Sequence, residues 1–182
     1  MLAMRFPEDL RVPIDNPLTG ARYELVRADG AARGPEALER LVEICNEPDI
    51  YDWLFRELLG GRPYSEGKAR EFLEWSGAGW SAGTHFVFLV LDGEGRIAAA
   101  CDIKSNDTVA EVGYWAGRDH RGVMTNTVRA LCALAAGAGF GRLFARTKAG
   151  NLRSQGVLLR AGFARVQDDP DGHARFELPL GP

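Results

Sequence analysis

Asn151-Leu152-Arg153-Ser154, with Gly162-Phe163 eight residues further on, is the stretch from which the architecture of this chain can be worked out. Asn is a favoured N-cap residue, and Gly is a common residue just after a helix end. We therefore expect a helix over 152–160. The apolar segment at 143–147, which comes before the Asn, predicts a strand. A strand that leads into a polar-capped helix places free backbone amides at the end of that strand.

A second helix is expected upstream, after the Arg121-Gly122 loop. Its apolar positions recur at spacings of four, three, four and three, which is the helical period. They are Met124, Val128, Leu131, Ala135 and Ala138. Backbone N–H groups at the start of a helix bind phosphate, because the free donors and the helix dipole converge there. Loop, helix, strand and capped helix in this order predict a pocket for a phosphate-bearing cofactor.

The rest of the chain reads as one mixed α/β domain over residues 21–182, after an extended arm at 1–20 that contains three prolines. Apolar runs predict strands at 23–27, 85–91, 96–103, 109–116, 164–166 and 174–178. Helices are expected at 36–45 and 49–59 and from residue 65 to about 75. Turns at 92–95 and 169–172 join pairs of strands into hairpins.

Composition narrows the class of protein. Of 182 residues, 46% are apolar and 26% charged, with a net charge of −3, so we expect no nucleic-acid partner, which would need a basic stripe. No apolar run reaches membrane-span length, and residues 1–20 contain no signal-peptide core. The cysteines and histidines lack ligand spacing, so we expect no metal. The chain is expected to be cytoplasmic, as a monomer or homodimer. The histidine before the loop, His120, is expected to be solvated.

Residues 109–163 resemble the acetyl-CoA core of the GNAT superfamily of N-acetyltransferases, and most closely its RimJ/RimL-like ribosomal-protein branch. The residues that carry the resemblance are the strand Ala110-Glu111-Val112-Gly113-Tyr114-Trp115, the loop Arg121-Gly122, the stretch Asn151-Leu152-Arg153-Ser154, Leu158 and Gly162-Phe163. Earlier segments fit that fold in order. The resemblance implies a mostly antiparallel sheet that is splayed at the cofactor groove, with helices on both faces.

The phosphate loop departs from the family pattern, which is Arg or Gln, two residues, Gly, one residue, then Gly or Ala. Aligned from Arg121, the loop has Met124 and Asn126 where small residues are expected. Aligned with Gly122 as the first glycine, it has Asp119 at the Arg or Gln position, and Met124 departs. A Met side chain could fill the place of the anion or turn into the core. Thr125 and Asn126 could compensate with side-chain hydrogen bonds.

The resemblance implies acetyl-CoA as cosubstrate and a primary amine, on a small molecule or a protein N-terminus, as acceptor. The implied cofactor-binding residues are Trp115, Ala116, Arg121, Gly122, Val123, Met124, Thr125, Asn126, Asn151 and Ser154. Ser154 would protonate the departing thiolate, and backbone donors near Trp115 would polarise the thioester carbonyl. Plain capping explains Asn151 nearly as well, and both roles are compatible.

Glu111 is the candidate base for the amine proton, directly or through water, with a salt-bridged surface carboxylate as the alternative. An α-amine, with a pKa of about 7.7–8.0, needs less help to lose its proton than a lysine, with a pKa of about 10.4. Asp52 and Trp53 are candidate acceptor contacts, although most of these early aromatic residues are expected in the core. The alternative to an enzyme is a GNAT-fold binding or regulatory module that has lost CoA binding at Met124 and Asn126.

Overall fold

A computed structural model describes residues 4–30 and 34–181. The helices are α1 (Pro35–Cys45), α2 (Pro48–Ile50), the π-helical turn η1 (Tyr51–Phe55), α3 (Glu66–Ala82), the 3-10 turn η2 (Arg118–His120), α4 (Val123–Ala138) and α5 (Leu152–Ala161). The strands are β1 (Arg11–Asp15), β2 (Arg22–Arg27), β3 (Phe86–Leu91), β4 (Ile97–Ile103), β5 (Val109–Ala116), β6 (Arg142–Lys148), β7 (Ala164–Arg165) and β8 (His173–Pro179). The expected mixed α/β fold is confirmed.

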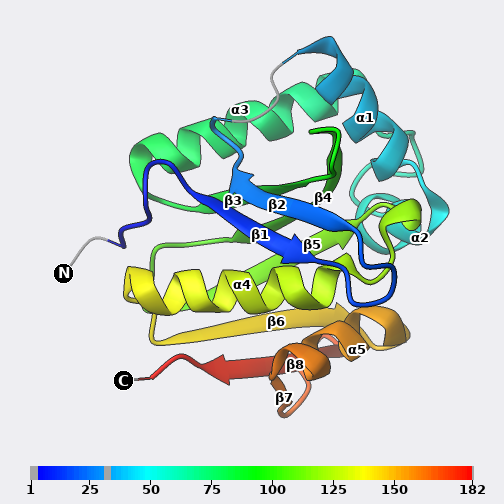
Figure 1. Cartoon of the computed structure of the whole chain (residues 1–182). Helices are drawn as coiled ribbons and strands as arrows, with labels where there is room; N and C mark the ends of the chain where they lie inside the picture. Colours follow the sequence, from blue (N-terminus) through cyan, green and yellow to red (C-terminus); the bar gives the residue numbers. More distant parts are fainter. Residues whose placement is uncertain (1–3, 31–33, 182) are drawn as a thin grey trace.

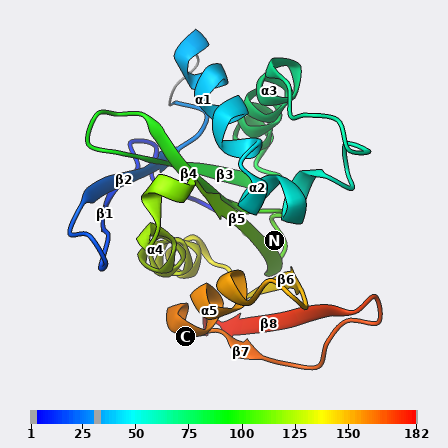
Figure 2. The same cartoon turned by 90° about the vertical axis from the view of Figure 1, so that its right-hand side faces the viewer.

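One eight-stranded sheet in the order β1-β2-β3-β4-β5-β6-β8-β7 forms the middle layer. Every neighbouring pair is antiparallel except β5 with β6. Helices α1 and α3 lie on one side of the sheet, and α4 and α5 lie on the other (Figure 2). The strand β3 is therefore covered on both faces, as its unbroken apolar run predicts.

Three boundaries differ from the expectation, and one of them is the end of α3, which lies at Ala82 rather than at about residue 75. Residues 11–15, which we assigned to an arm outside the domain, form β1 and pair with β2 along the edge of the sheet (Figure 1). Pro13 is compatible with this position because an edge strand can lack an N–H donor. The helix expected at 49–59 is instead the short α2 followed by η1.

The parallel pair β5–β6 determines where the site lies. These two strands are in register only from Val109↔Arg142 to Glu111↔Phe144. Beyond that point β5 continues to Ala116 and β6 to Lys148 without pairing to each other. The sheet is therefore splayed in its middle, and backbone groups on the facing edges of both strands are left without a strand partner.

Candidate active site

A cavity of about 460 Å³ occupies this splay. Its walls come from the separated parts of β5 and β6, from the amino ends of α4 and α5, and from the segment around α2 and η1. The side chains used below are among its lining residues: Leu18, Asp49, Trp53, Lys104, Tyr114, Trp115, Ala116, Arg118, Arg121, Met124, Thr125, Thr147, Asn151, Ser154 and Arg160, with Gly113 and Gly122.

Residues that face both sides of the sheet line the cavity, since successive side chains of a strand point to opposite faces. Val112 and Tyr114 pack with the core cluster that contains α4 and α5. Trp115 packs with the cluster that contains α1 and α3. All three residues line the same cavity. A ligand on the α4/α5 side can therefore meet a second ligand on the α1/α3 side through the splay.

The start of α4 has the geometry of an anion site. Gly122, with φ of 97°, is the N-cap residue, and no side chain caps the helix. The first N–H groups of such a helix have no intrahelical acceptor. Gly122, Met124 and Thr125 line the cavity. The positive φ falls at residue 122, which is the glycine of the second alignment of the loop.

Met124 lies inside the first turn of α4 rather than in the loop. Its side chain is 5% exposed and belongs to the core cluster on that side of the sheet, although it also forms part of the cavity wall. Asn126 does not face the cavity, since its amide donates to the carbonyl oxygen of Asp15 at 2.7 Å. Of the two compensating side chains that we expected, only Thr125 lines the cavity.

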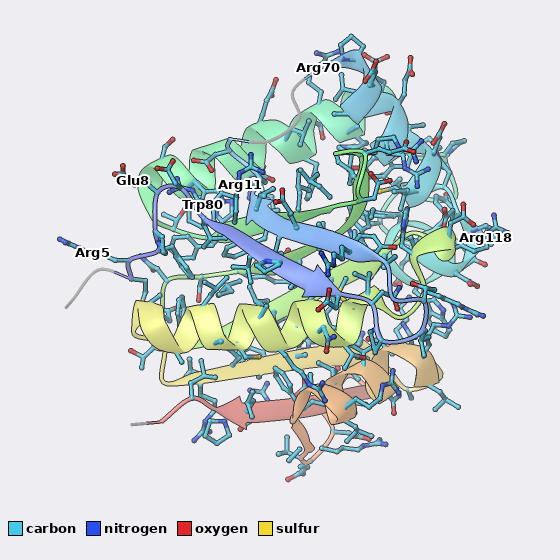
Figure 3. All side chains as sticks on the ribbon, in the orientation of Figure 1. Arg5, Glu8, Arg11, Arg70, Trp80 and Arg118 are labelled. Atoms are coloured by element: carbon cyan, nitrogen blue, oxygen red, sulfur yellow. The ribbon has the colours of Figure 1, made fainter. Side chains whose placement is uncertain are left out.

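Three arginines, Arg118, Arg121 and Arg160, line the same end of the cavity. None of them has a carboxylate within ion-pairing distance in the described part of the chain. Arg118 reaches the edge of the molecule (Figure 3). Arg160 donates from Nε to the hydroxyl oxygen of Thr125 at 3.3 Å, so it joins α5 to the start of α4. Unpaired guanidinium groups beside free amides favour a phosphorylated ligand.

His120 is not solvated as expected. Its Nε2 lies 3.1 Å from Nη2 of Arg40, and its Nδ1 lies 3.1 Å from the hydroxyl of Tyr23. A guanidinium can only donate, so Nε2 must accept, and the ring is neutral with its proton on Nδ1. Burial and the charge of Arg40 lower the pKa of His120. This half-buried ring links the segment before the loop to Tyr23 and Arg40.

The amino end of α5 holds two hydroxyl groups together. Asn151 accepts the N–H of Ser154 at 3.2 Å, which confirms its capping role, and Asn151 also lines the cavity. The hydroxyl of Tyr114 lies 2.8 Å from Oγ of Ser154 and 2.9 Å from the Ser154 carbonyl oxygen. Burial raises the pKa of Tyr114, so the phenol keeps its proton. The phenol donates its one proton to the carbonyl oxygen, so the hydroxyl of Ser154 can donate to the phenol oxygen or to a ligand.

Thr147 supplies a further polar atom on this side of the sheet. Its hydroxyl is buried and has no hydrogen-bond partner in the part of the chain that the structure describes. It lies on β6, beside the splay, and lines the cavity. Buried hydroxyl groups are normally satisfied, and a ligand with a polar arm would satisfy this one.

On the opposite face, charged groups surround Gly113. A side chain at this position would meet Oδ1 of Asp102 at 2.8 Å and Cε of Lys104 at 3.2 Å. The N–H of Gly113 donates to Oδ1 of Asp102 at 2.8 Å. Burial raises the pKa of Asp102. Glu111 pairs with Nζ of Lys104 at 2.7 Å and does not line the cavity.

The remaining wall of this face comes from α2 and η1. Trp53 lines the cavity, and its ring lies over Gly150 before α5, where Cη2 would be 3.3 Å from an added Cβ. Asp52 points elsewhere and pairs with Arg56 at 2.6 Å. The carboxylate that lines the cavity is Asp49, which pairs with Arg153 at 2.7 Å.

The structure therefore brings most of the expected site residues to one cavity, and leaves Glu111, Asp52, Val123 and Asn126 outside its lining. Sequence reasoning missed Tyr114, although strand alternation already separated it from Glu111. It also missed Arg160 and Thr147, which carry no signal in the sequence.

Among residues 4–30 and 34–181, no three His, Cys, Asp or Glu side chains are grouped so that they could hold a metal ion. No helix in the same residues has the length and apolar character to cross a membrane.

Comparison with known families identifies the chain. The acetyltransferase (GNAT) domain matches residues 33–164, so the chain belongs to the GNAT acetyltransferases. No curated protein sequence matches it.

Solved structures share the fold at low sequence identity. RimJ of Mycobacterium smegmatis, in complex with CoA-disulfide, has a TM-score of 0.72 at 16% identity, over 93% of this chain and 86% of that one. The ribosomal-protein-S5-alanine acetyltransferase of Vibrio fischeri has a TM-score of 0.71 at 16% identity, over 94% and 97%. The Microcin C7 self-immunity acetyltransferase MccE, in complex with acetyl-CoA and AMP, has a TM-score of 0.67 at 16% identity, over 86% and 92%.

Proposed function

We propose that this protein is an acetyl-CoA-dependent N-acetyltransferase that acetylates a primary amine by direct transfer in a ternary complex. The observation that carries the proposal is the cavity itself. It passes through the splay between β5 and β6, with amides and unpaired arginines at one end and a separate wall on the other face. Such a passage suits a long phosphorylated donor that meets its acceptor inside the sheet.

The donor belongs on the α4/α5 side. The free amides at Gly122–Thr125 and the guanidinium groups of Arg118, Arg121 and Arg160 would hold its phosphates. The polar arm would then follow the unpaired edge of β5 and reach the hydroxyl of Thr147. RimJ and MccE, which share the fold, are described in complex with CoA-disulfide and with acetyl-CoA.

The reaction needs three things from this chain. Unpaired backbone N–H groups near Trp115 would stabilise the negative charge on the thioester carbonyl oxygen. When the amine nitrogen bonds to the carbonyl carbon and the carbon–sulfur bond breaks, Ser154 would give its proton to the sulfur. Tyr114, kept protonated by burial, would hold the Ser154 hydroxyl in place across the 2.8 Å between the two hydroxyl oxygens, and solvent would return the proton to Ser154.

The amine must lose a proton as it attacks. Glu111 lies outside the cavity lining and is paired with Lys104, so in this proposal the proton reaches it through water. A water relay suits an acceptor that is already partly neutral. An α-amine, with a pKa of about 7.7–8.0, meets this condition better than a lysine side chain.

Two measurements test the proposal in sequence. Calorimetric titration with acetyl-CoA should give micromolar affinity, and thiol release should depend on an added amine from a panel of N-terminal peptides, amino acids, aminoglycosides and polyamines. No heat and no thermal shift at millimolar acetyl-CoA would end the proposal and leave a binding module on the GNAT fold. Titration with CoA thioesters of longer acyl chains would show whether the donor is acetyl.

A further inference from the structure

The turn between β1 and β2 lies against the start of α4 (Figure 1). This hairpin, over residues 11–27, precedes the part of the chain that matches the family domain. Its turn contacts the loop that would hold the phosphates.

Asn16 joins the turn to the loop with both atoms of its amide. Nδ2 donates to the carbonyl oxygen of Arg121 at 2.8 Å, and Oδ1 accepts the N–H of Leu18 at 3.0 Å. The backbone of Asn16 closes the turn through hydrogen bonds with Ala21 and Gly20. The side chain is 1% exposed, so water cannot replace these partners at low cost.

The contact with Gly122 is equally close. A Cβ at this position would lie 2.4 Å from Oδ1 of Asn16 and 2.8 Å from the side chain of Leu18. The residue must therefore be glycine for its φ of 97° and for the approach of the turn. One turn further into α4, Asn126 donates to the carbonyl oxygen of Asp15 at 2.7 Å. The hairpin thus holds the loop on both sides of the free amides.

Leu18 has a different position from Asn16. Its side chain is 74% exposed, yet it lines the cavity together with Arg121 and Gly122. An exposed leucine beside an anion site offers an apolar contact next to bound phosphates.

We propose that the β1–β2 turn is a wall of the cofactor site, in which Asn16 positions the Arg121-Gly122 loop and Leu18 contacts the nucleotide portion of the cofactor. This inference rests on the proposed function, since it assumes CoA as the ligand. It adds a positioning residue and a contact residue from a segment outside the matched domain.

The test compares four variants of the full chain by calorimetric titration with CoA and by steady-state kinetics. Asn16→Ala should weaken CoA binding about tenfold, because a buried hydrogen bond to the loop is lost. Asn16→Asp should weaken it more, since a carboxylate cannot donate to Arg121 and repels phosphate. Leu18→Ala should weaken it about threefold. The value of kcat at saturating acetyl-CoA, and the KM for the amine, should change less than twofold.

Thr19→Ala is the matched control in the same turn. Its hydroxyl is exposed and accepts only the N–H of Ala21 at 3.2 Å, so CoA affinity should stay within twofold of the wild type. Equal CoA affinity in Thr19→Ala, Leu18→Ala and Asn16→Ala would overturn the inference while leaving the proposed function intact. If Asn16→Ala does not fold, unchanged affinity in the exposed Leu18→Ala overturns it alone. A wild-type protein that binds no CoA overturns both.

Discussion

The two halves of the cavity are built in different ways. On the α4/α5 side, partly buried hydrogen bonds and a glycine turn hold the site, as in the contacts of Asn16 with Arg121 and of Tyr114 with Ser154. On the α1/α3 side, the charged wall consists of ion pairs between exposed or half-exposed side chains, such as Lys104 with Glu111 and Asp49 with Arg153.

This difference suggests that the two sides of the cavity bind different kinds of ligand. Buried hydrogen bonds are costly to break and fix one geometry, which suits a donor of constant structure. Exposed ion pairs contribute little to stability and can rearrange around different ligands, which suits a changeable acceptor. Four experiments test whether the two halves behave in this way, from the largest expected effect to the smallest.

Ser154→Ala should lower kcat about 100-fold, because the thiolate loses its proton donor. KM for acetyl-CoA should change little, since the N–H of Ser154 that Asn151 caps is retained. Stopped-flow or steady-state assays of thiol release would measure the change in kcat. Tyr114→Phe keeps the ring and the serine, and should give a smaller loss of kcat of about tenfold. Full activity in Ser154→Ala would remove Ser154 from the chemistry.

Gly122→Ala should weaken CoA binding about 20-fold while kcat changes less. The left-handed backbone costs a residue with a Cβ about 1–2 kcal/mol, and the new methyl would meet Asn16 at 2.4 Å. Calorimetric titration with CoA would give the loss. Gly95→Ala, in the turn between β3 and β4, is the control, because Gly95 also has a positive φ and an added Cβ there would meet nothing within 4 Å. Equal CoA affinity in both variants would mean that the loop does not hold the phosphates.

The α4/α5 side of the cavity, where the donor is proposed to bind, should become less stable in acid because His120 takes up a proton. The pKa of His120 is lowered in the fold, so its contribution to stability is present above the unfolded pKa of about 6.5 and is lost as pH falls below it. Protonation would remove the acceptor for Arg40. We expect the Tm to fall by a few degrees between pH 7.5 and pH 5.5. His120→Gln, which keeps a donor and an acceptor, should lose this part of the pH dependence. An equal fall in both proteins would show that His120 does not titrate as proposed.

Trp53→Ala should raise the KM for the amine about threefold and leave CoA affinity unchanged. Trp53 lines the cavity on the α1/α3 side, where the amine acceptor is proposed to bind. Asp52→Ala is the neighbouring control, because Asp52 pairs with Arg56 and lies outside the lining. Steady-state kinetics with the amine as the varied substrate would compare the two. A larger effect from Asp52 than from Trp53 would reverse our assignment of this wall.

Much of the second half of the fold follows from local signals. The period of α4, the cap at Asn151 and the apolar run of β3 each specify an element on their own. The first half was harder to predict. α3 continues through Gly77 and Gly79 to Ala82 because Gly79 packs under the ring of His85, where a Cβ would be 2.4 Å away. No local pattern shows such a contact.

The candidate site shows the same contrast between residues that local sequence predicts and residues that it does not. The loop at Gly122 and the pair Asn151 and Ser154 could be located because helix ends have recognisable sequences. The partners of these residues come from distant segments: Asn16 lies 105 positions before Arg121, and Tyr114 lies 40 positions before Ser154. Only the tertiary structure brings them together. It also packs Met124 in the core cluster, where it forms part of the cavity wall, and turns Asn126 toward Asp15.

A crystal structure of the protein with CoA tests the central claim most directly. We predict the diphosphate at the N–H groups of Gly122–Thr125, the arm between β5 and β6, and the sulfur beside Oγ of Ser154. A CoA molecule bound outside the splay, or with its phosphates away from the start of α4, would contradict this account.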